Sequence, residues 1–379
     1  MLERTLPNTG LLSAAKDVAT AAERSAAAAE AARRLDAEVV KEVVAAGFAR
    51  HFVPRDAGGN AGTFTELSEA VVTVGASCPA TAWCASLFAN LARMAAFLPV
   101  EGYREIWAEG PDAVVVGSLT PAGKATAVPG GWRLSGAWSY ISAVDFSDWA
   151  LVAGTVVTEA EPQALMFAVP RSAYSVVDSW SSVGMRATGS NTLVLDEVFV
   201  PTPRAFRRED LFAGRAVDST AACHSVPLQA ANGLSFATPT LGAAQGALRA
   251  WSQYMGEKLR TASVPGRPPV NRAAHERTLS RSSGEIDAAG LLLERASAVA
   301  DLGSAVSPLQ TARNLRDCSL AVEQLVTAVD RLFRAGGTSG QSEHSPMQRF
   351  WRDVNAASTH VALQFDAAAG VYGGEVFPS

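Results

Sequence analysis

Two short segments in the middle of the chain carry residue types that could do chemistry. The first, SGAWSYIS at residues 135–142, places Trp138, Tyr140 and Ser142 close together, and the second, GMRATGSN, follows at residues 184–191. Aromatic rings can cover a flat conjugated cofactor, and a hydroxyl can hydrogen-bond a polar edge of its ring. The two segments therefore predict a binding site for a flat aromatic cofactor.

Alternation along a strand predicts that Trp138 and Tyr140 lie on the same face and flank Ser142. In the second segment, Arg186, Thr188 and Ser190 add a cation and two hydroxyls in a glycine-containing loop, which could hold a cofactor phosphate or the rim of a substrate. The alternatives stay open. Both rings could pack in a β core, Ser142 could satisfy a neighbouring strand, and the loop could be a structured turn.

The elements that must position these residues fall into regions. Residues 1–110 have helical periodicity, residues 111–203 have roughly seven period-two segments with turn residues between them, and residues 204–231 form a mixed connector. Residues 232–379 return to the helical period and predict an up-and-down bundle. The predicted fold class is α+β, mostly α, with a β barrel or sandwich between two helical regions.

The last part of the bundle contributes one titratable group and one glycine pair. A final helical stretch at residues 346–369 carries His360, and Gly336 and Gly337 precede it. A histidine can orient or deprotonate a substrate near neutral pH, although a lone histidine on an apolar helix is often a packed residue. A glycine pair allows close approach to a backbone, or it simply ends a helix.

Composition excludes several classes of protein. With 48% hydrophobic residues the chain can bury a large core, and its net charge of −5 argues against a nucleic-acid surface. Neither a signal peptide nor a run of about eighteen apolar residues is present in the sequence, which predicts a cytoplasmic protein with no membrane span. Its histidines and cysteines lack metal-ligand spacing, and glycine motifs of Rossmann and P-loop proteins are absent, so no metal site is predicted.

Nearly the whole chain resembles the acyl-CoA dehydrogenase superfamily. The resemblance rests on the order of the three regions and on five segments, at residues 53–59, 135–142, 180–201, 336–337 and 346–353. It implies an N-terminal helical domain, a central β domain and a C-terminal four-helix bundle around a flavin.

One departure selects a branch of that superfamily. The dehydrogenases carry a catalytic glutamate shortly after an Arg-Asp pair, because removal of the α-proton of an acyl thioester needs a carboxylate base. Here Arg352 and Asp353 are followed by VNAASTHV at residues 354–361, which has no acidic residue but contains His360. This pattern resembles the two-component flavin-dependent monooxygenases of the same fold.

That resemblance implies an oxidoreductase that takes dissociable reduced FMN or FAD from a separate flavin reductase and reacts it with O2. A C4a-hydroperoxyflavin would then hydroxylate an aromatic, polyketide-type or other natural-product small molecule of secondary metabolism, or would oxygenate an amine or amino sugar at nitrogen. An acyl-CoA dehydrogenase with a displaced carboxylate, such as Asp366 or Glu285, and a scaffold without activity remain as alternatives.

The resemblance also assigns roles. Ser142 matches the residue beside flavin N5, and Tyr140 matches the ring that covers the isoalloxazine, with Trp138 next to it. Gly336 and Gly337 resemble the diglycine that meets the cofactor's diphosphate or adenine, often across a subunit interface, which implies a homotetramer. His360 would orient or deprotonate the substrate.

The N-terminal region departs from the phenol hydroxylases of this type. These enzymes usually have a second histidine there, and Asn90 stands at about that position. Asparagine can hydrogen-bond but cannot titrate. We therefore expect either that His360 serves alone or that the substrate is not a simple phenol.

Overall fold

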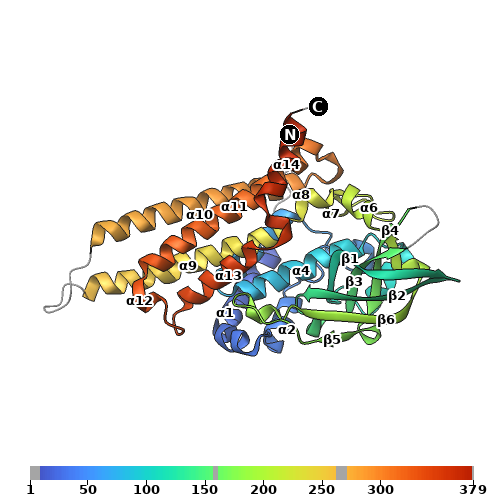
Figure 1. The fold of residues 1–379 in the computed structure, drawn as a ribbon, viewed down its shortest axis with the longest axis horizontal. Coiled ribbons are helices and arrows are strands. Elements are labelled where there is room, and N and C mark those ends of the chain that lie inside the picture. Colours follow the sequence, from blue (N-terminus) through green and yellow to red (C-terminus); the bar gives the residue numbers. More distant parts are fainter. Residues whose placement is uncertain (1–8, 157–160, 262–270, 378–379) are drawn as a thin grey trace.

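The computed structural model of the chain describes residues 9–156, 161–261 and 271–377. Figure 1 shows a bundle of long helices at one end, a β-sheet at the other, and the N-terminal helices beside and between them. This arrangement confirms the predicted fold class of α+β, mostly α.

The described part of the N-terminal region contains five α-helices, as its helical periodicity predicts. They are α1 (Thr9–Ala32), α2 (Ala37–Ala45), α3 (Phe64–Gly75), α4 (Pro79–Ala95) and α5 (Val100–Ile106). The start of α3 is fixed by a capping box, in which Thr63 and Glu66 each hydrogen-bond the other's backbone N–H. Pro79 begins α4, because proline is tolerated in the first turn of a helix.

The strands of the described residues form one seven-stranded sheet in the order β5-β6-β2-β1-β3-β4-β7. Their bounds are β1 (Val115–Val128), β2 (Gly131–Ile141), β3 (Trp149–Val156), β4 (Gln163–Pro170), β5 (Ser175–Val177), β6 (Asn191–Pro201) and β7 (Ala205–Arg207). β2 pairs antiparallel with β6, so the two segments at 135–142 and 184–191 meet at one end of this pair.

The connector holds three short helices, and the bundle follows it. The short helices are α6 (Arg208–Ala213), α7 (Ala222–Ser225) and α8 (Leu228–Ala231). The bundle consists of α9 (Leu234–Thr261), α10 (Arg272–Ala300), α11 (Pro308–Ala335), the short α12 (Gly337–Gly340), α13 (Pro346–Ser358) and α14 (Phe365–Val376).

The helical stretch predicted at residues 346–369 is interrupted, which corrects the prediction that His360 lies on a helix. α13 ends at Ser358, and the 3-10 turn η7 (Val361–Leu363) separates it from α14. Ser358 and Thr359 donate their hydroxyls to the carbonyls of Asn355 and Ala356, at 2.8 and 2.7 Å. Such side-chain hydrogen bonds compete with helical ones, and they end α13 here.

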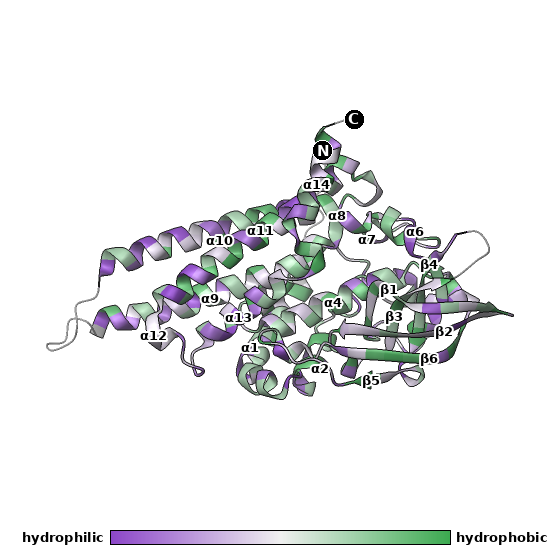
Figure 2. Ribbon diagram, viewed as in Figure 1, coloured by the Kyte–Doolittle hydropathy of each residue, from purple (hydrophilic) through white to green (hydrophobic). Residues whose placement is uncertain are grey.

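Helix α4 lies between the bundle and the sheet, packing against α3, α9, α13 and β1. Every residue of α4 except Leu87 is buried, as expected for a helix surrounded by other elements. Figure 2 shows mostly hydrophobic colouring along α4, whereas α10 at the edge of the bundle has many hydrophilic turns. α4 can therefore present side chains to both the sheet and the bundle.

Candidate functional site

A chain of hydroxyl groups joins the two segments that the sequence singles out. Ser142, just after β2, has its Oγ 2.8 Å from that of Ser190, which is 2.7 Å from Oγ1 of Thr188. Thr188 donates in turn to the carbonyl of Met185 at 2.8 Å. All three hydroxyl residues are buried, and the backbone N–H of Ala143 donates to the carbonyl of Thr188 at 2.8 Å. Three predicted site residues are thus brought together.

Trp83 of α4 completes this chain from the helical side. Its indole N–H donates to Ser142 Oγ at 3.2 Å. The Trp83 ring lies 5.0 Å from the ring of Phe236 at the start of α9 and meets the His360 ring edge-on at 5.8 Å. Helix α4, α9 and the turn after α13 therefore meet the end of β2 at one place.

His360 lies at this meeting point as the N-cap of η7. Its imidazole stacks on Phe236 with ring centroids 3.6 Å apart, and its Nδ1 accepts the backbone N–H of Ala362 at 3.2 Å. Burial lowers the pKa of His360 to about 4. The ring is therefore neutral at pH 7, and because Nδ1 is an acceptor, its proton is on Nε2. The free edge of the imidazole is a hydrogen-bond donor.

Tyr140 and Trp138 do not share a face, contrary to the prediction from their spacing. Between Trp138 and Ile141 two residues of β2, Ser139 and Tyr140, oppose the single residue Thr192 of β6, and Tyr140 in this bulge has a left-handed φ of 67°. The bulge re-aims the side chain, so that Tyr140 is 75% exposed while Trp138 is 1% exposed.

The two rings consequently have different surroundings. Trp138 packs inside the β region against Gly123 and Gly136 and donates its indole N–H to the Ala153 carbonyl at 2.9 Å. The ring of Tyr140 instead meets that of Trp180 edge-on at 6.1 Å. Trp180 donates to the carbonyl of Met185 at 3.1 Å, which connects Tyr140 to the hydroxyl chain.

Arg186 and Asn90 hydrogen-bond to backbone carbonyls. The guanidinium of Arg186 donates to the carbonyls of Glu30 and Ser182, at 3.4 and 3.1 Å. Asn90 lies about two turns beyond Trp83 on α4 and is buried, with its Nδ2 2.9 Å from the carbonyl oxygen of Ser86. The hydrogen bonds of these two side chains therefore go to backbone carbonyls and not to Ser142, Thr188 or Ser190.

Gly336 separates α11 from α12 and Gly337 begins α12, toward the opposite end of the molecule from the sheet (Figure 1). Beside them is a surface cleft of about 630 Å³ lined by Thr278, Thr327, Asp330, Arg331, Arg334 and Ala335. Within one chain the glycine pair is therefore far from Ser142.

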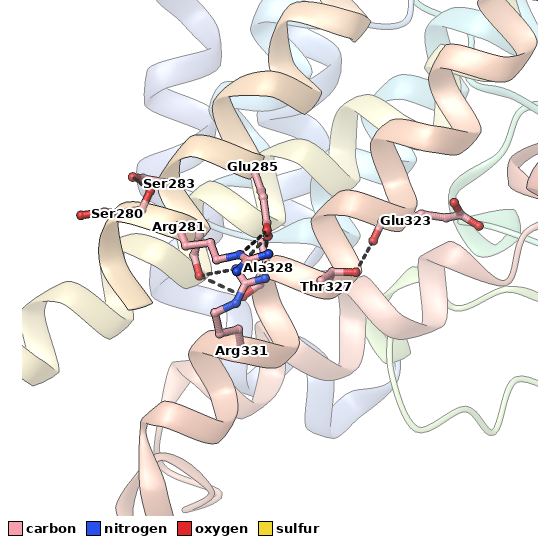
Figure 3. Close-up of polar contacts among 9 residues, drawn as sticks. Ser280, Arg281, Ser283, Glu285, Glu323, Thr327, Ala328 and Arg331 are labelled. Carbon is pink, nitrogen blue, oxygen red and sulfur yellow. Dashed lines mark hydrogen bonds and ion pairs between the residues drawn. The ribbon is translucent and has the colours of Figure 1, made fainter. Parts of the chain in front are cut away.

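The two carboxylates considered as displaced bases are also away from Ser142. Figure 3 shows Glu285 of α10 between Arg281 and Arg331, with Arg331 donating to both Glu285 oxygens at 2.7 and 2.9 Å. Burial raises the pKa of Glu285, but the hydrogen bonds and charges of Arg331 and Arg281 outweigh it, and the net pKa lies below the usual value. Asp366 is exposed on α14. Neither carboxylate is placed or tuned as a base for this site.

The chemistry of these groups fits an isoalloxazine. Ser142 supplies a hydroxyl at a polar edge, and Tyr140 supplies a largely exposed ring on a strained backbone that packing alone would not require. Trp83, Phe236 and His360 add an apolar wall with one polar edge. A flat ring with polar atoms along one side has matching partners here.

Sequence reasoning missed Trp83 and Phe236. Trp83 is the one large ring in the alanine-rich segment PATAWCAS at residues 79–86. A single large side chain among small ones indicates the point at which a helix packs against another element. Phe236 has no comparable signal, because its role depends on where α9 begins relative to His360.

Comparisons with known proteins identify the family of the chain. Residues 234–365 match the family described as acyl-CoA dehydrogenase, C-terminal domain. The chain is 32% identical to the oxygenase component of an FADH(2)-dependent resorcinol hydroxylase from Rhizobium sp. (strain MTP-10005), with 98% of this chain and 94% of the relative covered. It is 31% identical to HsaA, the oxygenase subunit of a flavin-dependent monooxygenase from Mycobacterium tuberculosis, with 93% and 91% covered.

Solved structures give the same result for the fold. The HsaA monooxygenase from M. tuberculosis superposes with a TM-score of 0.90 at 29% identity, with 98% of each chain covered. XiaF from Streptomyces sp., solved in complex with FADH2 and glycerol, gives a TM-score of 0.89 at 27% identity, with 98% of this chain and 96% of that one covered.

Proposed function

The chain belongs to the flavin-dependent monooxygenase oxygenase components of the acyl-CoA dehydrogenase superfamily, and from this premise we propose that it hydroxylates a phenolic small molecule. Membership makes it an oxidoreductase that uses reduced flavin and O2. The substrate class is the proposal. Its support is that a resorcinol hydroxylase and a p-hydroxyphenylacetate 3-hydroxylase are among the relatives.

The observation that carries the proposal is the convergence of Ser142, Trp83 and His360. Trp83 contacts both of the other residues, through its N–H to Ser142 and through its ring edge to His360. Ser142, which is proposed to hydrogen-bond the flavin edge, and His360, which is proposed to hydrogen-bond a substrate hydroxyl, thus both contact the indole of Trp83.

We assign roles to these residues as follows. Ser142 donates or accepts a hydrogen bond at the flavin ring edge and is held by Ser190 and Trp83. His360 donates its Nε2–H to the oxygen of a phenol or phenolate and so orients the ring. Phe236 and Trp83 exclude water beside it. Reduced flavin, when bound, supplies the electrons that activate oxygen.

The hydrogen bond at Nδ1 limits the chemical roles open to His360. A general base needs an acceptor nitrogen, but the Nδ1 of His360 already accepts the Ala362 N–H. Orientation, not proton removal, is therefore the function proposed for His360. With Asn90 in place of a second histidine, no other imidazole contacts Ser142, Trp83 or Phe236 in the described part of the chain.

The proposed cofactor form is reduced FAD, supplied by a separate flavin reductase. Two relatives are described with FADH2, and oxygenase components of two-component systems imply such a partner. The cleft beside Gly336 and Gly337, with two arginines, would suit a diphosphate. Because this cleft is far from Ser142 in one chain, we propose a homotetramer in which a second copy supplies it.

The function is tested with purified protein and chemically reduced FAD. Under isotope-labelled oxygen, resorcinol and p-hydroxyphenylacetate are expected to give hydroxylated products that carry one labelled oxygen atom, detected by mass spectrometry. An amine and an amino sugar serve as comparison substrates. Labelled product from the amines alone would contradict the phenol proposal, and oxidised FAD bleached by an acyl thioester would favour a dehydrogenase.

A further inference from the structure

Helix α13 holds the segment that carries the hydroxyl chain through two adjacent side chains. Arg352 donates to the carbonyl of Val183 at 2.5 Å, and Asp353 Oδ1 accepts the backbone N–H of Met185 at 2.6 Å. Gly184 between them lies so close that a Cβ there would be 2.2 Å from the carbonyl oxygen of Arg352. The backbone of α13 and the backbone of this segment are therefore in direct contact.

The backbone of Met185 links α13 to the hydroxyl chain. Its backbone has a left-handed φ of 51°, a conformation that non-glycine residues adopt only when their surroundings impose it. Its carbonyl accepts hydrogen bonds from Trp180 and from Thr188, and Thr188 leads through Ser190 to Ser142. The backbone of one residue, Met185, thus connects Asp353, through its N–H, to the hydroxyl chain that ends at Ser142, through its carbonyl oxygen.

We propose that Asp353 is a positioning residue of the flavin site, which sets the place of the Ser142 hydroxyl by fixing the backbone of Met185. The proposal rests on the proposed function, because Ser142 is taken to meet the flavin. Asp353 acts through Met185, Thr188 and Ser190 and touches neither cofactor nor substrate.

The surroundings of Asp353 support a structural anchor. It lies near Trp83 and Met185, and it is 5% exposed. Burial raises its pKa to about 7, and the charged or titratable groups around it are Glu30 of α1, Arg349 and Arg352 of α13, and Cys78 before α4. Even the neutral acid keeps a carbonyl oxygen that can accept the Met185 N–H.

The test compares three variants of the full chain by amide hydrogen exchange without flavin. Asp353→Ala removes the acceptor, and exchange at residues 183–190 is expected to accelerate roughly tenfold. Asp353→Asn keeps an acceptor oxygen and is expected to recover most of the protection. Asp317→Asn is the matched control, because Asp317 is a fully buried carboxylate on α11 that pairs with Arg295 and Arg316, away from this segment.

A second readout connects the anchor to the flavin. Asp353→Ala is expected to raise the dissociation constant for reduced FAD, measured under anaerobic conditions. It is also expected to raise the share of oxygen released as hydrogen peroxide, the effect that is expected of Ser142→Ala. Thr188→Val, which breaks the chain one link later, is expected to do the same without faster exchange at Met185. If Asp353→Ala does not fold, Thr188→Val still tests whether the hydroxyl chain controls flavin binding and peroxide release.

Two results would overturn the proposal. The first is wild-type exchange at residues 183–190 in Asp353→Ala, or an acceleration spread over the whole chain as in a general loss of stability. The second is unchanged flavin binding and peroxide release in a variant whose segment does exchange faster. A protein that oxygenates no phenol would contradict the proposed function alone, since the exchange measurement needs no flavin.

Discussion

At the scale of single residues, the direction of the Ser142 hydroxyl is set by its hydrogen-bond partners more than by its place after β2. Ser190 and Trp83 both hydrogen-bond it, so its direction is fixed before any ligand binds. Preorganised donors of this kind need little rearrangement during a reaction.

Ser142→Ala is expected to lower the ratio of hydroxylated product to hydrogen peroxide by roughly tenfold, the effect of losing one buried hydrogen bond. Product and peroxide are measured together in single-turnover reactions with reduced FAD. Ser139→Ala is the control, because Ser139 is an exposed serine of β2, the strand that ends just before Ser142. An equal fall in both variants would assign the effect to the strand.

His360 gives a pH prediction at the same scale. Because its pKa is depressed to about 4, the ring stays neutral between about pH 6 and 9, and no step near its ordinary pKa is expected in the rate. His360→Gln places an amide donor near the position of Nε2, and the ratio of its rate to that of the wild type is expected to be constant over this range.

His360→Leu keeps an apolar side chain but has no donor. We expect its kcat/KM for a phenol to fall about tenfold or more below that of His360→Gln. A wild-type rate that rises through about pH 6.5 and becomes flat in both variants would identify His360 as a general base and contradict the donor role.

At the scale of elements, close backbone contacts between helices set where the side chains of the site lie. α3 and α9 cross at Gly75 and Gly242, where a Cβ on Gly242 would be 2.5 Å from the Val72 carbonyl oxygen. The crossing brings α9, with Phe236 near its start, toward α4 and Trp83.

Gly242→Ala is expected to lower the free energy of unfolding by about 1–3 kcal/mol, since the neighbouring backbone must move. Gly256→Ala on the same helix has nothing within 4 Å of the new Cβ, and it is expected to be neutral or stabilising by up to about 1 kcal/mol. Urea unfolding of the two variants measures the difference. Equal effects would mean that the crossing has room for a side chain.

At the scale of the whole molecule, buried groups connect the regions of the fold. His224 of the connector is fully buried, with Nε2 donating to the carbonyl of Phe52 at 2.7 Å and Nδ1 2.6 Å from the hydroxyl of Ser219. Burial lowers its pKa to about 4. In the unfolded chain the same histidine takes up a proton near pH 6.5.

The sign of the resulting pH effect follows from these two values. Between about pH 6.5 and 4 the unfolded state binds more protons at His224, so the stability from this group is present above the unfolded pKa and is lost as pH falls, by up to about 3 kcal/mol. In His224→Gln, the loss of stability between pH 7.5 and 5, measured by urea unfolding, is expected to be smaller than in the wild type. An equal loss would place the acid sensitivity elsewhere.

The proposed tetramer makes a further prediction at this scale. A chain with Ser142→Ala and a chain with Gly337→Trp each lack one half of a site that two copies are proposed to share. Co-expression is expected to restore activity in up to roughly a quarter of the sites of mixed oligomers. Mixed oligomers that form, as differential tags would report, but stay inactive would place both halves in the same chain.

The sequence by itself determined the order of the regions, the fold class and Ser142 as the residue to examine. These features rest on local periodicity and on short motifs, which every chain segment carries independently of its neighbours. Tyr140 and Trp138 show what these local patterns do not predict. Regular alternation would place both side chains on one face of β2, but a single bulge turns Tyr140 to a different face from Trp138.

Only the tertiary structure decided which other residues surround Ser142. Trp83, His360 and Asp353 come from two helices and a turn that are distant from β2 in the sequence, and the end of α13 depends on side-chain hydrogen bonds that periodicity does not report. Their meeting depends on helix crossings and on the left-handed backbone of Met185. Such contacts arise from packing between elements, and so they have no signature in any one segment of the chain.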